Sequence, residues 1–186
     1  MHNPPLVWNN PVMRPAVLVL LVLVSVAGCT SSGPPAPSST SPVPTTLSEV
    51  WLPPDPQPTS PGPCPYLDTT FVADTNGQRV SKVQTSPAEP HPACFFYALA
   101  GKLQLTARVY VGDPAVAKAL VDHAAPVGTS NPATRPAGWQ GGYQATGNGA
   151  VYAVAKQGAA VVVTTNQEQT VKARTVVEQV VLALGL

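Results

Sequence analysis

Apolar residues occupy every second position from Leu103 to Val111, with Gln, Thr, Arg and Tyr between them. Because the side chains of a strand alternate between its two faces, this pattern predicts a strand with one buried and one more polar face. Similar segments predict five further strands, at residues 79–85, 94–99, 141–147, 150–156 and 159–165. Short glycine-containing turns separate several of them, so we expect antiparallel hairpins; the turns are Ala100-Gly101, Asn148-Gly149 and Gln157-Gly158.

Three segments have the spacing of helices. The first is short and covers residues 65–73. The second begins at Asp113-Pro114, an acidic N-cap residue followed by proline at the first helical position, and runs to Ala125. The third follows Asn166 and Gln169, whose spacing is typical of a capping box. Its apolar stripe consists of Ala173, Val177, Val180, Val181 and Leu184.

The predicted order is therefore helix, three strands, helix, three strands, helix. Strands joined by short turns pair as meanders, and amphipathic helices cover the buried face of such a sheet. We expect an α+β fold of antiparallel β-meanders covered by two or three helices.

The longest apolar run lies near the N-terminus, from Pro15 to Val26, directly after Arg14. It is shorter than the roughly 20 residues that cross a bilayer as a helix, and its layout is that of a secretory signal. The run ends in Val26-Ala27-Gly28-Cys29, which resembles a bacterial lipobox. The resemblance implies that residues 1–28 are cleaved and that Cys29 is lipidated and anchors the protein to the membrane. The alternative is a simple cleaved signal in which Cys29 has no role.

A proline-rich segment follows. Residues 30–63 contain eleven prolines, interleaved with Ser and Thr and almost without charge. Such a sequence cannot bury enough apolar surface to offset its ordering entropy, so we expect an extended spacer. The predicted organisation is a signal peptide at 1–28, a lipidated N-terminus with a disordered linker at 29–62, and a single globular domain at 63–186.

Cys64 and Cys94 are the two cysteines left after Cys29. Both lie beyond the membrane, where an even pair predicts a disulfide. Closing a loop of this length stabilises a fold by roughly 3–4 kcal/mol on the chain-entropy model.

The layout of lipobox, Pro/Ser/Thr stalk, two-cysteine domain and closing amphipathic helix is similar to that of actinobacterial cell-envelope lipoproteins of uncharacterised function. The resemblance implies a location at the cell membrane, lipid-anchored on the extracytoplasmic face. It implies an envelope role and brings no catalytic residues.

The charge distribution and the candidate metal ligands bear on which partners and cofactors we expect. Without residues 1–28, the chain carries nine Lys or Arg and nine Asp or Glu, with no basic stripe, so we expect no nucleic-acid partner. His91, His123 and the cysteine pair resemble a Cys₂His₂ metal set, but their spacing is not that of an established site, and a disulfide uses both thiols. We therefore predict no metal and no cofactor.

Trp139 and Tyr143 form a candidate contact patch for a glycan, a lipid head group or a protein; the alternative is that both are core aromatics. The sequence thus predicts a non-enzymatic envelope protein that binds an envelope protein, lipid or glycan. Three alternatives stay open: a lipid or glycolipid carrier with a pocket between sheet and helices, a structural spacer, and an enzyme. The enzyme would use residues from the set Asp113, Asp122, His91 and His123.

Overall fold

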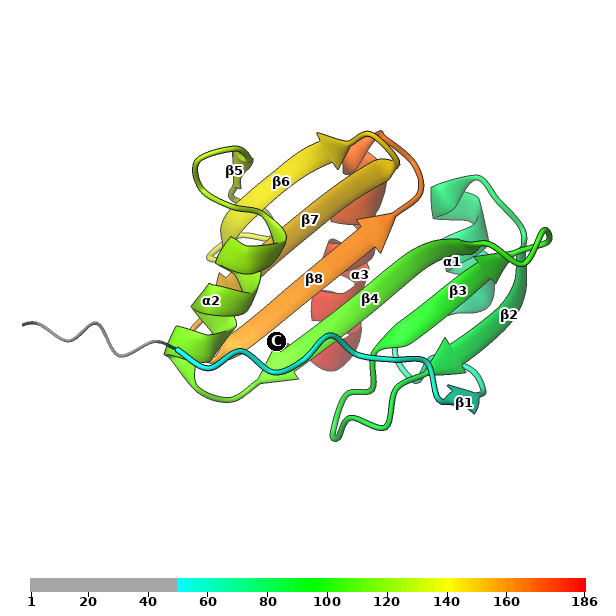
Figure 1. Cartoon of the computed structure of the whole chain (residues 1–186), viewed down its shortest axis with the longest axis horizontal. Coiled ribbons are helices and arrows are strands. Elements are labelled where there is room, and N and C mark those ends of the chain that lie inside the picture. The colour runs from blue at the N-terminus through cyan, green and yellow to red at the C-terminus, as the bar shows by residue number, and fades with distance from the viewer. Residues whose placement is uncertain (1–49) are drawn as a thin grey trace, which may run out of the picture. The chain divides into compact units, whose positions relative to one another are not determined.

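A computed structural model of the protein describes residues 50–186 (Figure 1). The predicted signal peptide, Cys29 and the predicted linker up to residue 49 lie outside the described residues. The elements, in chain order, are β1 (Ser60–Pro61), α1 (Thr69–Asn76), β2 (Val80–Thr85), β3 (Cys94–Ala98), β4 (Leu103–Val111), α2 (Pro114–Ala124), β5 (Asn131–Ala133), β6 (Gln140–Thr146), β7 (Gly149–Lys156), β8 (Ala159–Thr165) and α3 (Thr170–Leu184).

The strands form one sheet of eight, in the order β1-β2-β3-β4-β8-β7-β6-β5. Every neighbouring pair is antiparallel. The first four strands and the last four are each consecutive groups, and β4 joins them by pairing with β8 from Leu105↔Thr165 to Val111↔Ala159. Figure 1 shows this pair in the middle of the sheet.

The predicted alternation of helices with three-strand meanders is wrong. The structure has one eight-stranded antiparallel sheet with three helices, and strands β1 and β5 form its two edges. Both edge strands are short and contain a proline, Pro61 or Pro132, so neither shows the alternation that predicts a strand. Proline is tolerated in both strands because an edge strand pairs on one side only, so a missing N–H on its other side costs no hydrogen bond of the sheet.

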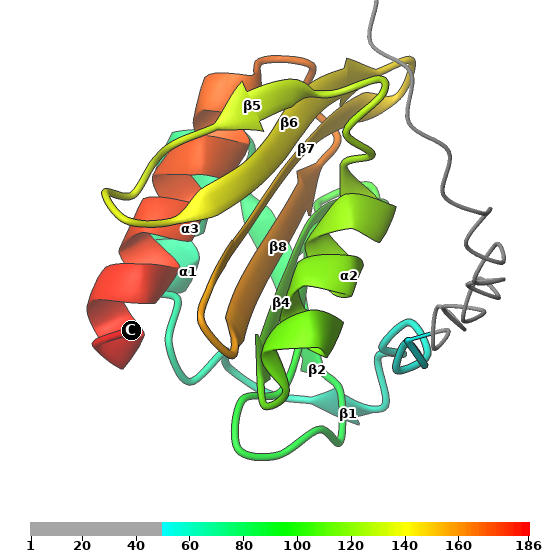
Figure 2. The ribbon, with the colours of Figure 1, turned by 90° about the vertical axis from the view of Figure 1, so that its left-hand side faces the viewer.

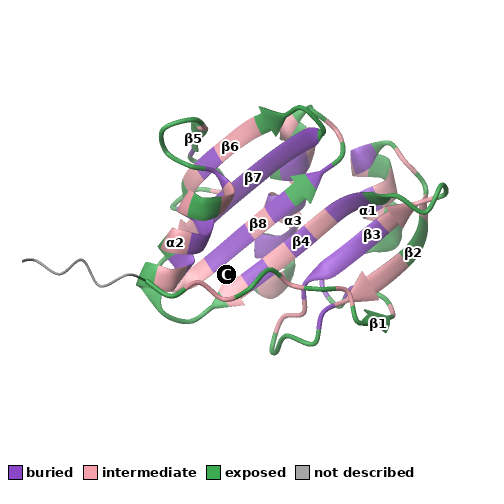
Figure 3. Ribbon diagram, viewed as in Figure 1, coloured by how far each residue is buried: buried purple, intermediate pink, exposed green. Residues whose placement is uncertain are grey.

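The helices lie on both faces of the sheet (Figure 2). α1 and α3 cover one face and enclose the larger core, which includes Phe96, Leu105 and Val177. α2 covers the other face over β7 and β8, and packs small residues such as Ala117 against Ala153. β7 therefore lies under a helix on each face, and Figure 3 shows it buried along most of its length.

The predicted disulfide between Cys64 and Cys94 is confirmed, with the two Cα atoms 5.6 Å apart. It links the segment before α1 to the first residue of β3. Tyr66 reinforces the same junction, because its buried hydroxyl lies 2.8 Å from the carbonyl oxygen of Pro92 and 3.2 Å from that of Ala107. Burial raises the pKa of the Tyr66 phenol well above its ordinary value.

A buried polar network holds the end of α1. The Asn76 side chain is fully buried, and its amide donates to Gln104 Oε1 at 3.0 Å and to Asn166 Oδ1 at 3.1 Å. The Thr165 hydroxyl donates to Asn76 Oδ1. The predicted capping box is therefore wrong: Asn166 bonds to α1, and Gln169, the N-cap residue of α3, makes no side-chain cap bond.

We expect Tyr66→Phe to lower the free energy of unfolding by about 1 kcal/mol at neutral pH, because one buried hydrogen bond is lost. The variant also tests the raised pKa. The folded protein holds the phenol proton where the unfolded chain releases it, near pH 10. The stability from this group is thus present below about pH 10 and lost as the pH rises further.

The measurement is urea unfolding between pH 8 and pH 11 (about the range in which tyrosine and lysine begin to titrate). Stability should fall less steeply with pH in Tyr66→Phe than in the wild type. Lysine titration is common to both proteins and cancels in the comparison. Parallel pH profiles would show that the Tyr66 phenol ionises as readily in the folded state as in the unfolded chain.

Candidate ligand-binding site

A groove of about 770 Å³ lies between α2 and the β5–β6 edge of the sheet. We call it the α2 groove. Its volume is within the usual range of small-molecule sites. Most of its wall is small and apolar, and it contains no aromatic ring; the lining residues are Pro114, Lys118, Val121, Asp122, Ala125, Val127, Ser130, Pro132, Ala133, Thr134, Gln140, Gly141, Ala155 and Gln157.

Two glycines in β6 allow α2 and the loop after it to approach the sheet closely. A Cβ atom at Gly141 would collide with the carbonyl oxygen of Ala153 and lie 2.8 Å from Val121 Cγ1. A Cβ atom at Gly142 would collide with the Ser130 hydroxyl. The floor of the groove is therefore shaped by the absence of side chains on β6.

The start of α2 is fixed as the sequence predicts. Asp113 is the N-cap residue, and its carboxylate accepts a hydrogen bond from the Ala115 N–H at 2.6 Å. Pro114 occupies the first helical position. Lys118 and Asp122 form an ion pair one turn apart on the wall of the groove, so their charges offset each other.

The predicted contact patch is not an exposed surface. Trp139 is only 2% exposed and belongs to the core under α1 and α3. Tyr143 is half-buried and stacks on Tyr152, with ring centroids 5.6 Å apart. Trp139 comes directly before β6 and packs inward, as the core-aromatic alternative for this residue expects.

The candidate catalytic and metal-binding residues lie apart. His123 is exposed on α2, whereas His91 lines a different cavity beside β4. Asp113 caps α2, Asp122 is paired, and the disulfide uses both thiols. Within residues 50–186, His, Cys, Asp and Glu nowhere gather in threes that could hold a metal ion. Over the same residues, no helix has the length and apolar character to span a bilayer.

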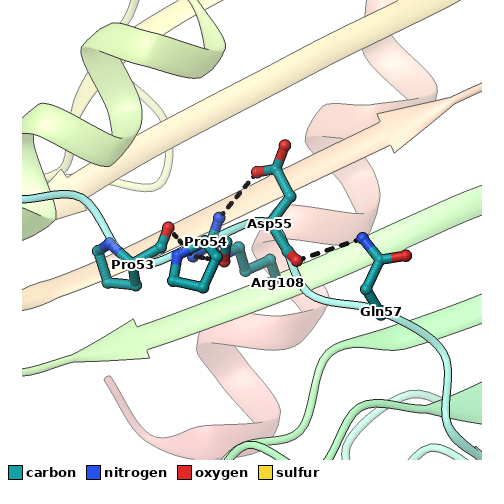
Figure 4. A network of polar contacts seen from close by, with 5 residues as sticks. All are labelled: Pro53, Pro54, Asp55, Gln57 and Arg108. Atoms are coloured by element: carbon teal, nitrogen blue, oxygen red, sulfur yellow. Dashed lines mark hydrogen bonds and ion pairs between the residues drawn. The ribbon is translucent and has the colours of Figure 1, made fainter.

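Residues 53–59, which the sequence assigned to the linker, lie along the sheet and end beside β1. We call this segment the strap. Figure 4 shows how Arg108 of β4 holds it: Nη2 donates to the carbonyl oxygens of Pro53 at 3.1 Å and Pro54 at 3.0 Å, and Nη1 to Asp55 Oδ1 at 3.3 Å. Burial lowers the pKa of the Arg108 guanidinium, and the Asp55 carboxylate opposes that shift.

The strap shares one sheet face with α2. A cavity of about 510 Å³ lies between the strap, the 86–93 loop and β4, and it contains His91 and Glu89. The carrier alternative in the sequence analysis included a pocket between sheet and helices, but the sequence did not locate the α2 groove and gave no sign of this second cavity. The walls of both come from segments that are far apart in the chain.

These features define a domain with one internal disulfide, one antiparallel sheet, helices on both faces of the sheet and an open groove at one edge. The chain belongs to the family described as Domain of unknown function (DUF2020), whose profile matches residues 52–186. The match begins at Leu52 and therefore includes the strap. A search of curated proteins finds no significant match to the chain.

We expect Arg108→Gln to free the strap and to lower the free energy of unfolding by roughly 1–3 kcal/mol, because two carbonyl bonds to a half-buried charged donor are lost. The matched variant Asp55→Asn removes only the ion pair. Asp55 has an 80% exposed side chain, so this second change should alter stability by less than about 1 kcal/mol.

The readouts are urea unfolding and the ¹⁵N heteronuclear Overhauser effect of the Asp55 and Gln57 amides. Both amides should become mobile in Arg108→Gln and stay ordered in Asp55→Asn. Equal mobility in the two variants would mean that the ion pair, rather than the carbonyl bonds, holds the strap.

Proposed function

We propose that this protein is a lipid-anchored cell-envelope protein whose domain binds a ligand non-catalytically in the α2 groove. The observation that carries the proposal is the groove itself, an open, mostly apolar cavity of about 770 Å³. The lipobox-like sequence that ends in Cys29 supports the anchor. The Cys64–Cys94 disulfide is consistent with an oxidising compartment outside the cytoplasm.

The groove is better suited to binding than to acid–base or nucleophilic catalysis. Among its lining residues, Lys118 and Asp122 are the titratable ones, and they are paired with each other. General acid–base catalysis needs a proton donor or acceptor with a tuned pKa within reach of the substrate. The histidines that could serve, His91 and His123, do not line the groove.

Among the ligands that the sequence left open, the groove favours a lipid. Its lining offers Val, Ala, Pro and Gly surface, which gains by covering a flexible aliphatic chain. A glycan site would be expected to present an aromatic face, and the groove has none. We therefore infer that the ligand is an amphiphile whose apolar chain lies in the α2 groove, which makes a lipid carrier the preferred form of the binding function.

The anchor is tested by Cys29→Ser. Without the thiol no diacylglycerol can be attached, and stable membrane attachment depends on such acyl chains. We expect the variant to leave the membrane fraction for the medium, as followed by fractionation and immunoblotting. The matched change Ser25→Ala, inside the apolar run, should leave the protein in membranes. Retention of Cys29→Ser in membranes would contradict the lipid anchor.

The groove is tested by native mass spectrometry of the intact chain released from detergent, with 1,2-dioctanoylglycerol as the added lipid. Val127 lines the groove and is 81% exposed, so Val127→Asp places a carboxylate against the lipid with little effect on folding. We expect lipid occupancy to fall about tenfold, since a charge is left against an apolar chain.

The control is Leu182→Asp, on α3, where the leucine is 75% exposed and does not line the groove. It makes the same chemical change on a different surface and should leave occupancy unchanged. The proposed function fails if the wild type retains no lipid, or if the two variants lose it equally.

A further inference from the structure

A third cavity, of about 300 Å³, lies at the β5–β6 edge of the sheet, on the side of α3. We call it the arginine cavity. Arg135 and Arg174 both line it, together with the stacked pair Tyr143 and Tyr152. Pro132 and Thr134 line both this cavity and the α2 groove, so the two are neighbours separated by β5 and the residues after it.

We propose that the arginine cavity binds the phosphate-type anionic head group of the amphiphile whose apolar chain lies in the α2 groove. The inference rests on the proposed function, because it takes the lipid in the groove as given. It adds the chemical class of the head group and the residues that recognise it.

Charge is the first argument. No acidic residue lines the arginine cavity, whereas Arg135 and Arg174 do. The nearest acidic partner is Glu178, one turn along α3, whose Oε1 lies 4.0 Å from Arg174 Nε. The two cations therefore outnumber the single carboxylate beside them, and the cavity attracts anions.

Unused donors are the second argument. Within the part of the chain that the structure describes, neither guanidinium donates a hydrogen bond shorter than 3.5 Å to protein. A guanidinium presents five N–H donors in a planar fork, which matches the oxygen atoms of a phosphate group. Arg108 differs from both, because its guanidinium donates hydrogen bonds to the strap.

Tyr152 positions the segment that carries Arg135. Tyr152 as a whole residue is 3% exposed, and its hydroxyl donates to the Arg135 carbonyl oxygen at 3.0 Å. Burial raises the pKa of the Tyr152 phenol, so the group stays a neutral donor. Tyr143 stacks on the same ring and completes one wall. The backbone of Arg135 is thus held against β7 by the hydrogen bond from Tyr152.

The α2 groove suits the apolar chain of an amphiphile, and the arginine cavity suits its anionic head group. In the α2 groove the one cation, Lys118, is neutralised by Asp122, and the remaining wall is mostly apolar. In the arginine cavity the cations have free donors. A ligand with an apolar chain and a phosphate head, passing the edge at Pro132 and Thr134, satisfies both.

The test is a competition, read by native mass spectrometry of the intact chain released from detergent. Equal amounts of 1,2-dioctanoyl phosphatidic acid and 1,2-dioctanoylglycerol are added, so the two lipids differ only in the phosphate. We expect the wild type to retain at least about tenfold more phosphatidic acid, since charge-assisted hydrogen bonds to phosphate are strong. Arg135→Gln with Arg174→Gln should bring the ratio close to one and leave dioctanoylglycerol occupancy unchanged.

The matched control is Arg79→Gln with Lys102→Gln, which removes the same charge from two exposed residues outside the cavity and should preserve the preference. Equal retention of both lipids by the wild type would overturn the head-group assignment and leave the proposed function standing. Retention of neither lipid would overturn the proposed function itself. If inorganic phosphate alone bound as tightly as phosphatidic acid, and Val127→Asp did not weaken phosphatidic acid, the cavity would be a free-phosphate site and the lipid assignment would be wrong.

Discussion

The pairing of β4 with β8 is the interaction on which the rest of the structure depends. Its seven residue pairs join strands that are more than 45 residues apart in the chain and make one sheet from two groups of four strands. The joined sheet gives α3 a continuous surface, and the core formed there includes Leu105 from β4 and Val163 from β8. The Cys64–Cys94 bridge and the Asn76 network then attach α1 and the segment before it to the same face.

The opposite face explains where the cavities lie. α2 covers β7 and β8, and it approaches β6 closely at Gly141 and Gly142. The strap covers β4 further along and is held there by Arg108 (Figure 4). Because neither cover reaches the β5 edge fully, the α2 groove stays open beside it. A short edge strand between two cavities places an apolar surface and a cationic one within reach of a single ligand.

The position of the strap bears on how the domain would be connected to the proposed anchor. The strap is part of the proline-rich segment 30–63, so Arg108 fixes the point at which this segment meets the sheet. A tether that ends at a fixed point limits which face of the domain can turn toward a membrane. The strap also occupies donors that would otherwise make Arg108 a further anion-binding group, whereas Arg135 and Arg174 line a cavity with their guanidinium donors unbonded to protein among the described residues.

The sequence by itself determined the features that depend on a few neighbouring residues or on the even number of cysteines left after Cys29. Asp113-Pro114 predicted the start of α2, and the even pair of cysteines left after Cys29 predicted the Cys64–Cys94 disulfide. The tertiary structure alone decided the single sheet, the edge strand at Pro132 and the use of Asn166 as a partner of α1, and it chose burial between the two roles that the sequence left open for Trp139. The physical reason is range: capping and strand alternation act within a turn or two of the backbone. The pairing of distant strands and the walls of a cavity are instead set by which segments meet once the whole chain has closed on itself.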